Sequence, residues 1–242
     1  MYTAAFRATG IRARYVAVRT GPAEVAAVLR ALATAGGGGN VTHPLKHGAF
    51  LAVHRASGQA TLLEACNTFW RDGEEVVGTN TDVAGIAAAV DELAAPPGGW
   101  LVIGTGASAR AAVAAAAARG APVAVESRDE VRGREFLEWA ASAGATVASP
   151  DDCVVLVNTA PLGLRDDGAV PRKWPPATVA ALDLSYGRAA TPWVRAAHRR
   201  GLRAADGRDV LVAQGAAAFT CWFPDVVPPT AEMRRAVDAA LE

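Results

Sequence analysis

A strand, a glycine-rich turn and a helix follow one another in the middle of the chain, and no other feature restricts the fold as strongly. The letters WLVIGTG predict a buried strand and ASARAAVAAAAARG predict a helix. Between them, Gly104, Gly106 and Ala109 form a G-x-G-x-x-A pattern. Such glycines permit a tight turn and let backbone N–H groups approach a pyrophosphate at the helix N-terminus. The junction therefore predicts a dinucleotide site, with a simple tight turn as the alternative.

Strands and helices continue to alternate after this junction. APVAVES predicts a strand, DEVRGREFLEWAASAG a helix, and CVVLVNT and VAALDLSY two further strands. Short connections between such elements are typical of a parallel sheet with helices on both faces. We therefore predict an α/β protein of two domains. A doubly wound domain spans 84–208, and an N-terminal α/β domain spans 1–83 and receives the last helices at 209–242.

The N-terminal part has a less regular pattern. MYTAAFRATG predicts a short helix, RARYVAV a strand because of its alternation, and GPAEVAAVLRALATAG a helix with Pro22 in its first turn. GGGGNVT predicts a short strand or loop before a helix opened by Pro44. CNTFWRDGEEVVGTN then predicts a hairpin, and TDVAGIAAAVDELA a helix with Thr81 as its N-cap.

The second predicted strand of the doubly wound domain ends in residues that affect the choice between NAD and NADP. Glu126 lies twenty residues after Gly106, where an acid would bind a ribose 2′-OH. Arg128 follows, with Arg132 and Arg134 at the start of the next helix, and guanidinium groups suit a 2′-phosphate. The pattern alone leaves both cofactors open, and a solvated helix face as well.

Lysine and asparagine are scarce in this chain, and their positions are informative. Of the 24 Lys and Arg residues only two are lysines, Lys46 and Lys173, and asparagine occurs four times. Three short polar clusters interrupt apolar segments: NVTHPLK, ACNT and GTNTD. Together these clusters contain Asn40, Thr42, Lys46, Asn67, Asn80 and Asp82.

Turn chemistry would explain any one of these clusters, since Asn suits left-handed positions and Thr caps helices. Three of them together favour a site for a polyol, which needs amide and hydroxyl partners fixed in place. Reduction of a carbonyl also needs a proton donor, and a lysine supplies one where a protein lowers its pKa, whereas an arginine does not. Lys46 is therefore a candidate proton donor.

Charge and cysteine content restrict the function class. The formal net charge is zero, so nothing draws the chain as a whole to nucleic acid or to an anionic membrane. No signal-peptide pattern and no bilayer-spanning apolar run is visible. Three widely spaced cysteines suit a reducing cytosol, and His43 and His47 lack an evident third metal ligand. We expect a cytoplasmic, metal-free protein that acts on a small molecule as a monomer or homodimer.

Taken together, the motifs resemble those of the shikimate dehydrogenase (shikimate/quinate dehydrogenase) family over almost the whole chain. NVTHPLK resembles the substrate loop of that family, ACNT and GTNTDVAG its next two site segments, and GTGASARA its cofactor loop. VNTAPLGL resembles the family's Asn-Ala-Thr-x-x-Gly-Met segment near the nicotinamide. LDLSY and AADGRDVLVAQGAAAF resemble the strand and the returning helix that close the site.

The resemblance implies a reversible NADP-dependent reduction of 3-dehydroshikimate to shikimate, a step of the chorismate pathway in aromatic amino acid biosynthesis. It implies that Lys46 and Asp82 form the catalytic pair. The implied substrate-binding residues are Asn40, Thr42, Asn67, Tyr186 and Gln214. The implied cofactor-binding residues are Gly104, Gly106, Ala107, Ser108, Ala109, Ser127, Arg128, Asn158, Thr159 and Gly207.

The chain departs from the family pattern in two places. Where the family has Asn-Arg-Thr, this chain has Ser127-Arg128-Asp129, and the acid leaves NAD open. The family begins with a strand and a Ser-x-Ser loop that binds the substrate carboxylate, whereas this chain begins with MYTAAF, which resembles the following helix. From this we expect NADP binding but poor shikimate binding. The alternatives are a quinate or aminoshikimate dehydrogenase that uses NAD, and a non-catalytic binding or regulatory paralogue.

Overall fold

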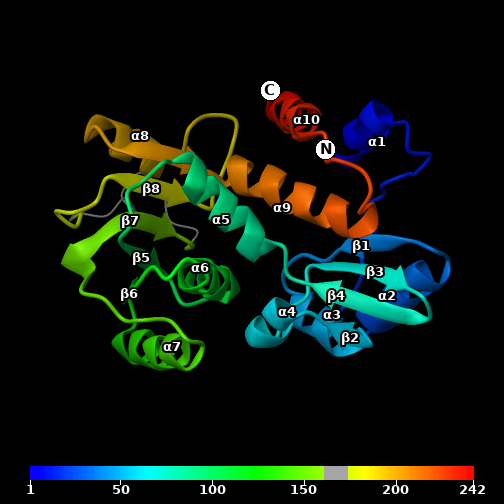
Figure 1. The fold of residues 1–242 in the computed structure, drawn as a ribbon, viewed down its shortest axis with the longest axis horizontal. Coiled ribbons are helices and arrows are strands. Elements are labelled where there is room, and N and C mark those ends of the chain that lie inside the picture. Colours follow the sequence, from blue (N-terminus) through cyan, green and yellow to red (C-terminus); the bar gives the residue numbers. More distant parts are fainter. Residues whose placement is uncertain (161–173) are drawn as a thin grey trace. The chain divides into compact units, whose positions relative to one another are not determined.

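The computed structural model describes residues 1–160 and 174–242 and divides into two compact units (Figure 1). Unit 1 contains Met1–Asp82 and Gln214–Val237, and unit 2 contains Val83–Ala213 and Asp238–Glu242. Lys173 and the end of the segment VNTAPLGL, from Pro161 onward, lie outside the described residues. The predicted α/β class is confirmed.

Unit 1 is built on a four-stranded sheet in the order β1-β3-β4-β2. Its strands are β1 (Gly38–Asn40), β2 (Arg55–Ala56), β3 (Thr68–Asp72) and β4 (Glu75–Thr79). Its helices are α1 (Tyr2–Thr9), α2 (Val25–Thr34), α3 (Lys46–Ala52) and α4 (Gly58–Leu63), joined by parts of α9 (Gly207–Trp222) and α10 (Thr230–Leu241). The predicted hairpin is β3–β4, an antiparallel pair, while β2 lies parallel to β4.

The core of unit 1 anchors helix α3. Leu29 of α2 and Ala49 of α3 pack with Phe69 of β3 and Val76 of β4 in one buried cluster. Each fully buried large apolar side chain in such a cluster contributes about 1.5–3 kcal/mol through the hydrophobic effect. Because α3 is held by this cluster, its first residue, Lys46, has a fixed position at the helix start.

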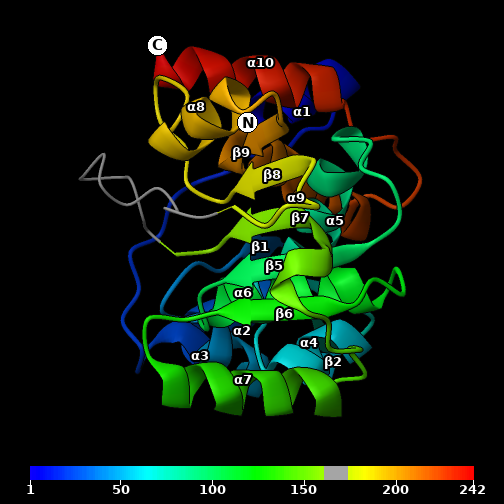
Figure 2. The same ribbon diagram turned by 90° about the vertical axis from the view of Figure 1, so that its left-hand side faces the viewer.

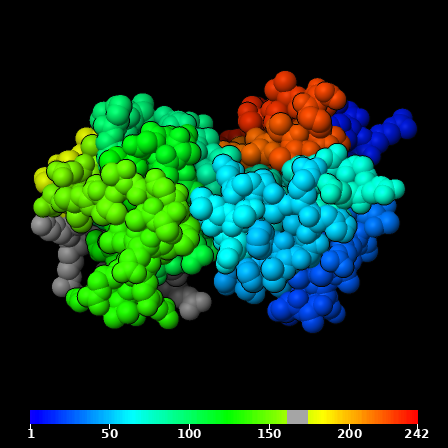
Figure 3. Space-filling model, turned by 60° about the horizontal axis from the view of Figure 1, so that its bottom comes forward, coloured from blue at the N-terminus to red at the C-terminus, as the bar shows by residue number. Residues whose placement is uncertain are grey.

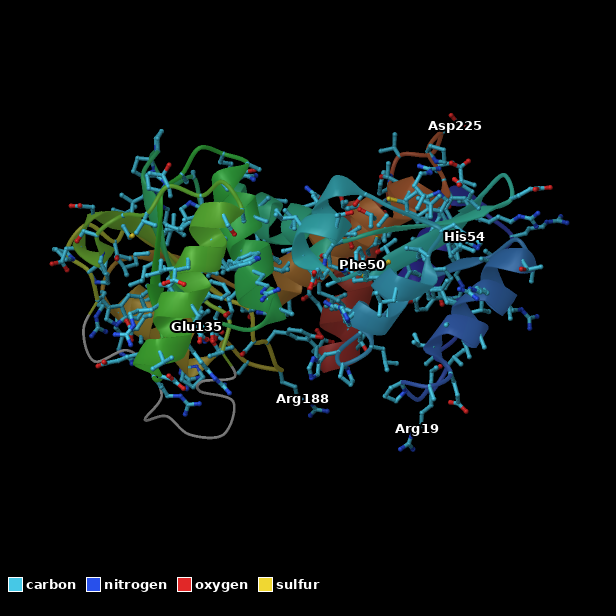
Figure 4. All side chains as sticks on the ribbon, turned by 90° about the horizontal axis from the view of Figure 1, so that it is seen from below. Arg19, Phe50, His54, Glu135, Arg188 and Asp225 are labelled. Atoms are coloured by element: carbon cyan, nitrogen blue, oxygen red, sulfur yellow. The ribbon has the colours of Figure 1, made fainter. Side chains whose placement is uncertain are left out.

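The segment RARYVAV at 12–18, predicted to be a strand, contains no strand in the structure. Within the described residues, β1 pairs only with β3, and this segment forms no ladder with the other edge of β1. The alternation also buries no face, because Val16 and Val18 are 67% and 52% exposed. Arg19, just beyond, points away from the ribbon (Figure 4). The prediction is therefore wrong, since alternation produces a strand only where a neighbour completes its hydrogen bonds.

Two helices of unit 1 begin later than their prolines predicted. Helix α2 starts at Val25, after a turn in which the Gly21 N–H donates to the Glu24 carboxylate over 3.0 Å. Helix α3 starts at Lys46, after a turn closed by a hydrogen bond from the Leu45 N–H to the Thr42 carbonyl. These turns satisfy backbone groups before the regular helix begins, and the second one places Lys46 in the first turn of α3.

Unit 2 contains a five-stranded parallel sheet in the order β6-β5-β7-β8-β9, which Figure 2 shows as a stack. The strands are β5 (Gly99–Ile103), β6 (Val123–Glu126), β7 (Cys153–Asn158), β8 (Ala180–Asp183) and β9 (Arg203–Asp206). The helices are α5 (Asp82–Glu92), α6 (Ala107–Ala117), α7 (Glu130–Ser142) and α8 (Pro192–Arg199), with the 3-10 turn η1 (Pro150–Asp152). Helix α7 lies at the surface of unit 2, in the green part of Figure 3.

The parallel strands end in one register, which defines an edge of the sheet. Ile103 of β5 pairs with Glu126 on one side and Asn158 on the other, and the row continues through Asp183 to Asp206. From β5 the chain moves outward to β6 and then returns to β7, so the strand order reverses at β5. Ligands of doubly wound proteins bind outside the carboxyl ends of the strands at such a reversal. The predicted doubly wound sheet is confirmed.

Several elements were not predicted from the sequence: β2, α4, α8 and β9. Helix α4 begins after Ser57, whose hydroxyl accepts a hydrogen bond from the Ala60 N–H. Helix α8 begins after Thr191, which caps the Val194 N–H in the same way. Among the described helices, none is long and apolar enough to cross a membrane.

Candidate active site

Lys46 and Asp82 form an ion pair in unit 1. Lys46 opens α3 and Asp82 opens α5, and the distance from Nζ to Oδ2 is 2.5 Å. Both side chains are 22% exposed, so the pair is largely shielded but reachable from solvent. An ammonium carries three donors, and within the described residues Asp82 takes one of them. Two N–H groups of Lys46 are thus free for a ligand.

Asn67 fixes the second oxygen of the Asp82 carboxylate. The Asn67 Nδ2 donates to Asp82 Oδ1 over 2.8 Å, and Asn67 Oδ1 accepts from the Thr81 N–H over 2.8 Å. Oδ1 also accepts from the hydroxyl groups of Thr68 and Thr81. Because these donors surround Oδ1, the amide must turn Nδ2 toward the carboxylate, which only accepts. Asn67 is 3% exposed, so the network holds Asp82 in one orientation.

Two further predicted residues join this network at its edges. The Thr81 hydroxyl lies 3.3 Å from Gln214 Oε1, which can accept its one proton in place of Asn67 Oδ1. The Asn40 Nδ2 donates to the Thr68 hydroxyl over 3.0 Å, and Asn40 Oδ1 accepts from the Tyr15 hydroxyl, also over 3.0 Å. The structure therefore brings together five residues that the sequence had marked. They are Asn40, Lys46, Asn67, Asp82 and Gln214.

Two predicted substrate residues lie outside the network. Thr42 is exposed, and its side chain makes no hydrogen bond within residues 1–160 and 174–242. Tyr186 belongs to unit 2, follows β8 and is 40% exposed. Sequence reasoning missed Thr68 and Tyr15, which both bond to Asn40. The letter T in ACNT was a usable signal for Thr68, whereas Tyr15 was hidden within the wrongly predicted strand.

Cys66 is a buried cysteine next to this site. The Cys66 N–H donates to the Lys46 carbonyl, so the thiol lies close to the pair. Burial raises the pKa of the Cys66 thiol to about 11, and a neutral thiol is a poor nucleophile. In the described parts of the chain, no three His, Cys, Asp or Glu side chains are grouped as a metal ion requires.

The predicted cofactor turn lies between β5 and α6. Gly104 has φ +109°, and a Cβ added there would lie 2.6 Å from the Thr159 hydroxyl, so only glycine fits. Gly106 is the N-cap of α6, and nothing lies near its α-carbon that a side chain would meet. Ala107, Ser108 and Ala109 form the first turn of α6, where free N–H groups and the helix dipole attract an anion. The residues present therefore fit a pyrophosphate.

The acid of Ser127-Arg128-Asp129 serves as a helix cap. The Asp129 carboxylate accepts from the Val131 and Arg132 N–H groups and so opens α7, while Ser127 accepts from the Asp129 N–H. This explains why an acid replaces the family's Thr, since both types cap helices well. Arg128 is exposed and makes no ion pair with any described residue, so it can reach a phosphate.

Three other predicted cofactor residues have structural partners within unit 2. Asn158 is fully buried and its Nδ2 donates to Asp183 Oδ1 over 2.9 Å. The Thr159 hydroxyl donates to the Ile103 carbonyl over 2.7 Å. A Cβ on Gly207 would lie 2.2 Å from the Leu184 carbonyl oxygen, which glycine alone permits. These contacts place all three at the carboxyl edge of the sheet, and their contact with a cofactor stays a prediction.

The arrangement can bind a small polyol and move a proton. Unit 1 offers a fixed carboxylate, an ammonium with free donors, and amide groups oriented by their neighbours. A positioned lysine of this kind can act as a general acid or base. Unit 2 offers a glycine-rich turn at a helix N-terminus, the usual cradle for a dinucleotide. A proton donor and a dinucleotide site are the two features that a hydride-transfer enzyme needs.

The comparisons with known proteins agree with this interpretation. The model of the shikimate dehydrogenase substrate binding domain matches residues 1–69, and that of the shikimate 5′-dehydrogenase C-terminal domain matches residues 207–237. Shikimate dehydrogenase (NADP(+)) from Methylocella silvestris is 36% identical, with 96% of this chain and 88% of the relative covered. The enzyme of the same name from Geobacter metallireducens is also 36% identical, with 100% and 91% covered.

Among solved structures, shikimate 5-dehydrogenase from Thermus thermophilus, in complex with NADP(H) and shikimate, is similar with a TM-score of 0.84 and 29% identity. That similarity covers 99% of this chain and 93% of the solved one. With relatives of 36% identity over nearly their full length, the chain belongs to the shikimate dehydrogenase family.

Proposed function

We propose that this chain catalyses the reversible, NADP-dependent interconversion of shikimate and 3-dehydroshikimate. The observation that carries the proposal is the network in which Asn67 fixes Asp82 and Asp82 holds the Lys46 ammonium. Relatives named for this reaction, and a similar structure that contains both NADP(H) and shikimate, support it. The network gives the reaction its proton donor, and the glycine-rich turn gives the cofactor its anchor.

In the direction of reduction, Lys46 acts as the general acid. NADPH, when bound, supplies the hydride that reduces the substrate carbonyl carbon. The oxygen gains negative charge as the carbonyl π bond breaks, and a free N–H of Lys46 delivers the proton that completes the hydroxyl. In the direction of oxidation, the Lys46 amine takes that proton back. Asp82 orients the ammonium through its 2.5 Å contact and thereby selects the N–H groups that face the substrate.

The remaining members of the network bind the substrate. Amide and hydroxyl groups suit the hydroxyls of a polyol because they both donate and accept. We assign this role to Asn67 and Gln214, with Asn40 and Thr42 beside them and with Tyr186 as a further contact. The matching substrate-domain model over residues 1–69 supports placing substrate binding in unit 1.

The cofactor role belongs to unit 2 in this proposal. Gly104, Gly106 and the first turn of α6 hold the pyrophosphate, and Arg128 holds the 2′-phosphate of NADP. Asp129 caps α7, and the backbone N–H groups that it accepts from offset part of its negative charge. A phosphate can therefore bind to Arg128 next to this acid.

We further propose that the protein acts in the cytoplasm as a monomer or homodimer. Its three cysteines, Cys66, Cys153 and Cys221, are all free thiols. Free thiols persist in a reducing compartment. A thermal unfolding profile that does not change with a disulfide reductant would agree with this placement.

Initial rates with two substrates and two cofactors test the function. Shikimate and quinate are each combined with NADP⁺ and with NAD⁺, and formation of the reduced cofactor is followed by absorbance. The proposal predicts the highest kcat/KM for shikimate with NADP⁺. A preference for quinate with NAD⁺ would identify a quinate dehydrogenase instead. Absence of turnover with every pair, from a folded protein, would identify a non-catalytic paralogue.

A further inference from the structure

Asp183 is a buried acid at the end of β8 that the proposed reaction leaves without a role. It is 1% exposed and lies in the register row between Asn158 of β7 and Asp206 of β9. Burial raises the pKa of its carboxyl, while the nearby Thr191 hydroxyl, Ser185 and Asn158 oppose the rise. All these neighbours are neutral, so none of them offsets the burial of Asp183 with a positive charge.

One oxygen of Asp183 accepts hydrogen bonds from residues at the starts of two connections, one after β7 and one after β8. Its Oδ1 accepts from Asn158 Nδ2 over 2.9 Å and from the Ser185 N–H over 3.1 Å. Asn158 in turn accepts from the Ala160 N–H over 3.2 Å through its own Oδ1. Asp183 therefore connects the loop after β7 with the loop after β8.

The first residues of each loop lie next to a glycine of the predicted cofactor site. Thr159, in the loop after β7, has its hydroxyl 2.6 Å from the position of a Cβ on Gly104. In the loop after β8, the Ser185 carbonyl accepts from the Gly207 N–H over 3.1 Å. The Leu184 carbonyl oxygen would lie 2.2 Å from a Cβ on Gly207. These values leave no room for a side chain at either glycine, so a displacement of Thr159 or of Leu184 changes the space beside that glycine.

The buried carboxyl of Asp183 is unfavourable for the stability of the fold. The carboxyl is 1% exposed, and the described groups around it, Thr191, Ser185 and Asn158, are neutral. Burying an acid among neutral groups destabilises a fold, and an apolar or amide side chain of similar size avoids that cost. A residue that is unfavourable for stability and yet organises two loops suggests a functional reason for its presence.

We propose that Asp183 is a positioning residue for cofactor binding, which holds residues 159–160 after β7 and residues 184–185 after β8 beside Gly104 and Gly207. The proposal rests on the proposed function, because it assumes that NADP binds at the glycine-rich turn. Asp183 acts through Asn158 and Ser185 and does not itself touch the reacting atoms. Its loss therefore weakens cofactor binding and leaves the substrate network of unit 1 intact.

The test compares three variants for NADP⁺ binding by calorimetry, for shikimate KM and for melting temperature. Asp183→Ala removes both hydrogen bonds of Oδ1, and we expect the Kd for NADP⁺ to rise about tenfold or more. The shikimate KM should stay within about twofold of wild type, since the hydrogen-bond network of unit 1 is unchanged. Asp183→Asn keeps an oxygen at the Oδ1 position, and we expect it to restore NADP⁺ binding to within about threefold.

Thr178→Val is the matched control for a loss of stability alone. Thr178 is buried near the opposite end of β8, where its hydroxyl donates to the Cys153 carbonyl. The variant should lower the melting temperature and leave the Kd for NADP⁺ unchanged. If Asp183→Ala does not fold, Asp183→Ser replaces it, because its short hydroxyl does not span to both loops.

The outcomes separate the two proposals. A wild-type protein that binds no NADP⁺ contradicts the proposed function itself. If the wild type binds NADP⁺ but the Asp183→Ala or Asp183→Ser variant binds it equally well, the positioning role is wrong. The role is also wrong if Thr178→Val, at a matched melting temperature, weakens NADP⁺ binding as much. Weakened binding that Asp183→Asn restores, with an unchanged shikimate KM, supports the role.

Discussion

Replacing Arg128 with alanine should separate NADP from NAD. Arg128 is exposed at the end of β6, and the adjacent Asp129 carboxylate is engaged with the Val131 and Arg132 N–H groups. The guanidinium is therefore free to make a charge-assisted hydrogen bond to a 2′-phosphate, worth about 1.5–3 kcal/mol. At about 1.4 kcal/mol per tenfold change, Arg128→Ala should raise the KM for NADP⁺ about ten- to a hundredfold. NAD⁺ lacks the phosphate, so its KM should hardly change.

The assay is the initial rate of shikimate oxidation as the concentration of each cofactor is varied. Arg132→Ala is the matched control, because Arg132 is also an exposed arginine of this region but lies 3.7 Å from Asp129, which partly neutralises it. We expect a smaller effect from this control. An equal loss for NADP⁺ and NAD⁺ in Arg128→Ala would show that Arg128 does not recognise the 2′-phosphate. Glu126, at the end of the same strand, would then be the better candidate, as part of an NAD site.

Three further predictions concern stability. Gly104 has φ +109°, and the Cβ of the Gly104→Ala variant would lie 2.6 Å from the Thr159 hydroxyl. This variant should lower the unfolding free energy by about 1–3 kcal/mol in denaturant titrations. Adding Thr159→Ala should recover part of the loss. Asn67→Leu leaves the buried Thr81 N–H without its acceptor and should lower the unfolding free energy by about 1–3 kcal/mol; an unchanged melting temperature would contradict this. Burial raises the pKa of Asp183 in the folded protein above its ordinary value of about 4. At a pH between these two pKa values, the native state binds more protons than the unfolded state. The unfolding free energy of wild type relative to Asp183→Asn should therefore fall as pH rises through that window, and a flat difference would be contrary evidence.

The sequence predicted the parallel sheet of unit 2 well because its signals are local. Each strand from β5 to β8 is a continuous apolar run, and a helix or a turn follows it directly. The two glycines after β5 also had local meaning, since Gly104 needs a positive φ and Gly106 caps a helix. Such features depend little on distant parts of the chain, so one sequence is enough to recognise them.

Some of the wrong and missing predictions depend on distant partners. The segment at 12–18 has the alternation of a strand, but a strand also needs a neighbouring strand that bonds to it, which no alternation encodes. Tyr15 reaches Asn40 across 25 positions of sequence, and Asn158 reaches Asp183 across another 25. The site motifs named Asn40 and Asn158, but only the fold could show which groups hold them.

The central claim is that Lys46 transfers a proton and does not merely supply charge. Lys46→Arg tests it most directly, because arginine keeps the positive charge and can keep the ion pair with Asp82, yet does not release a proton at working pH. The measurement is kcat for shikimate oxidation with saturating NADP⁺, with the melting temperature as a check on folding. Since general acid–base catalysis is usually worth about 10²–10⁴-fold, a folded Lys46→Arg variant should lose at least about a hundredfold in kcat. A kcat near that of wild type would contradict the account and leave Lys46 as a simple charge.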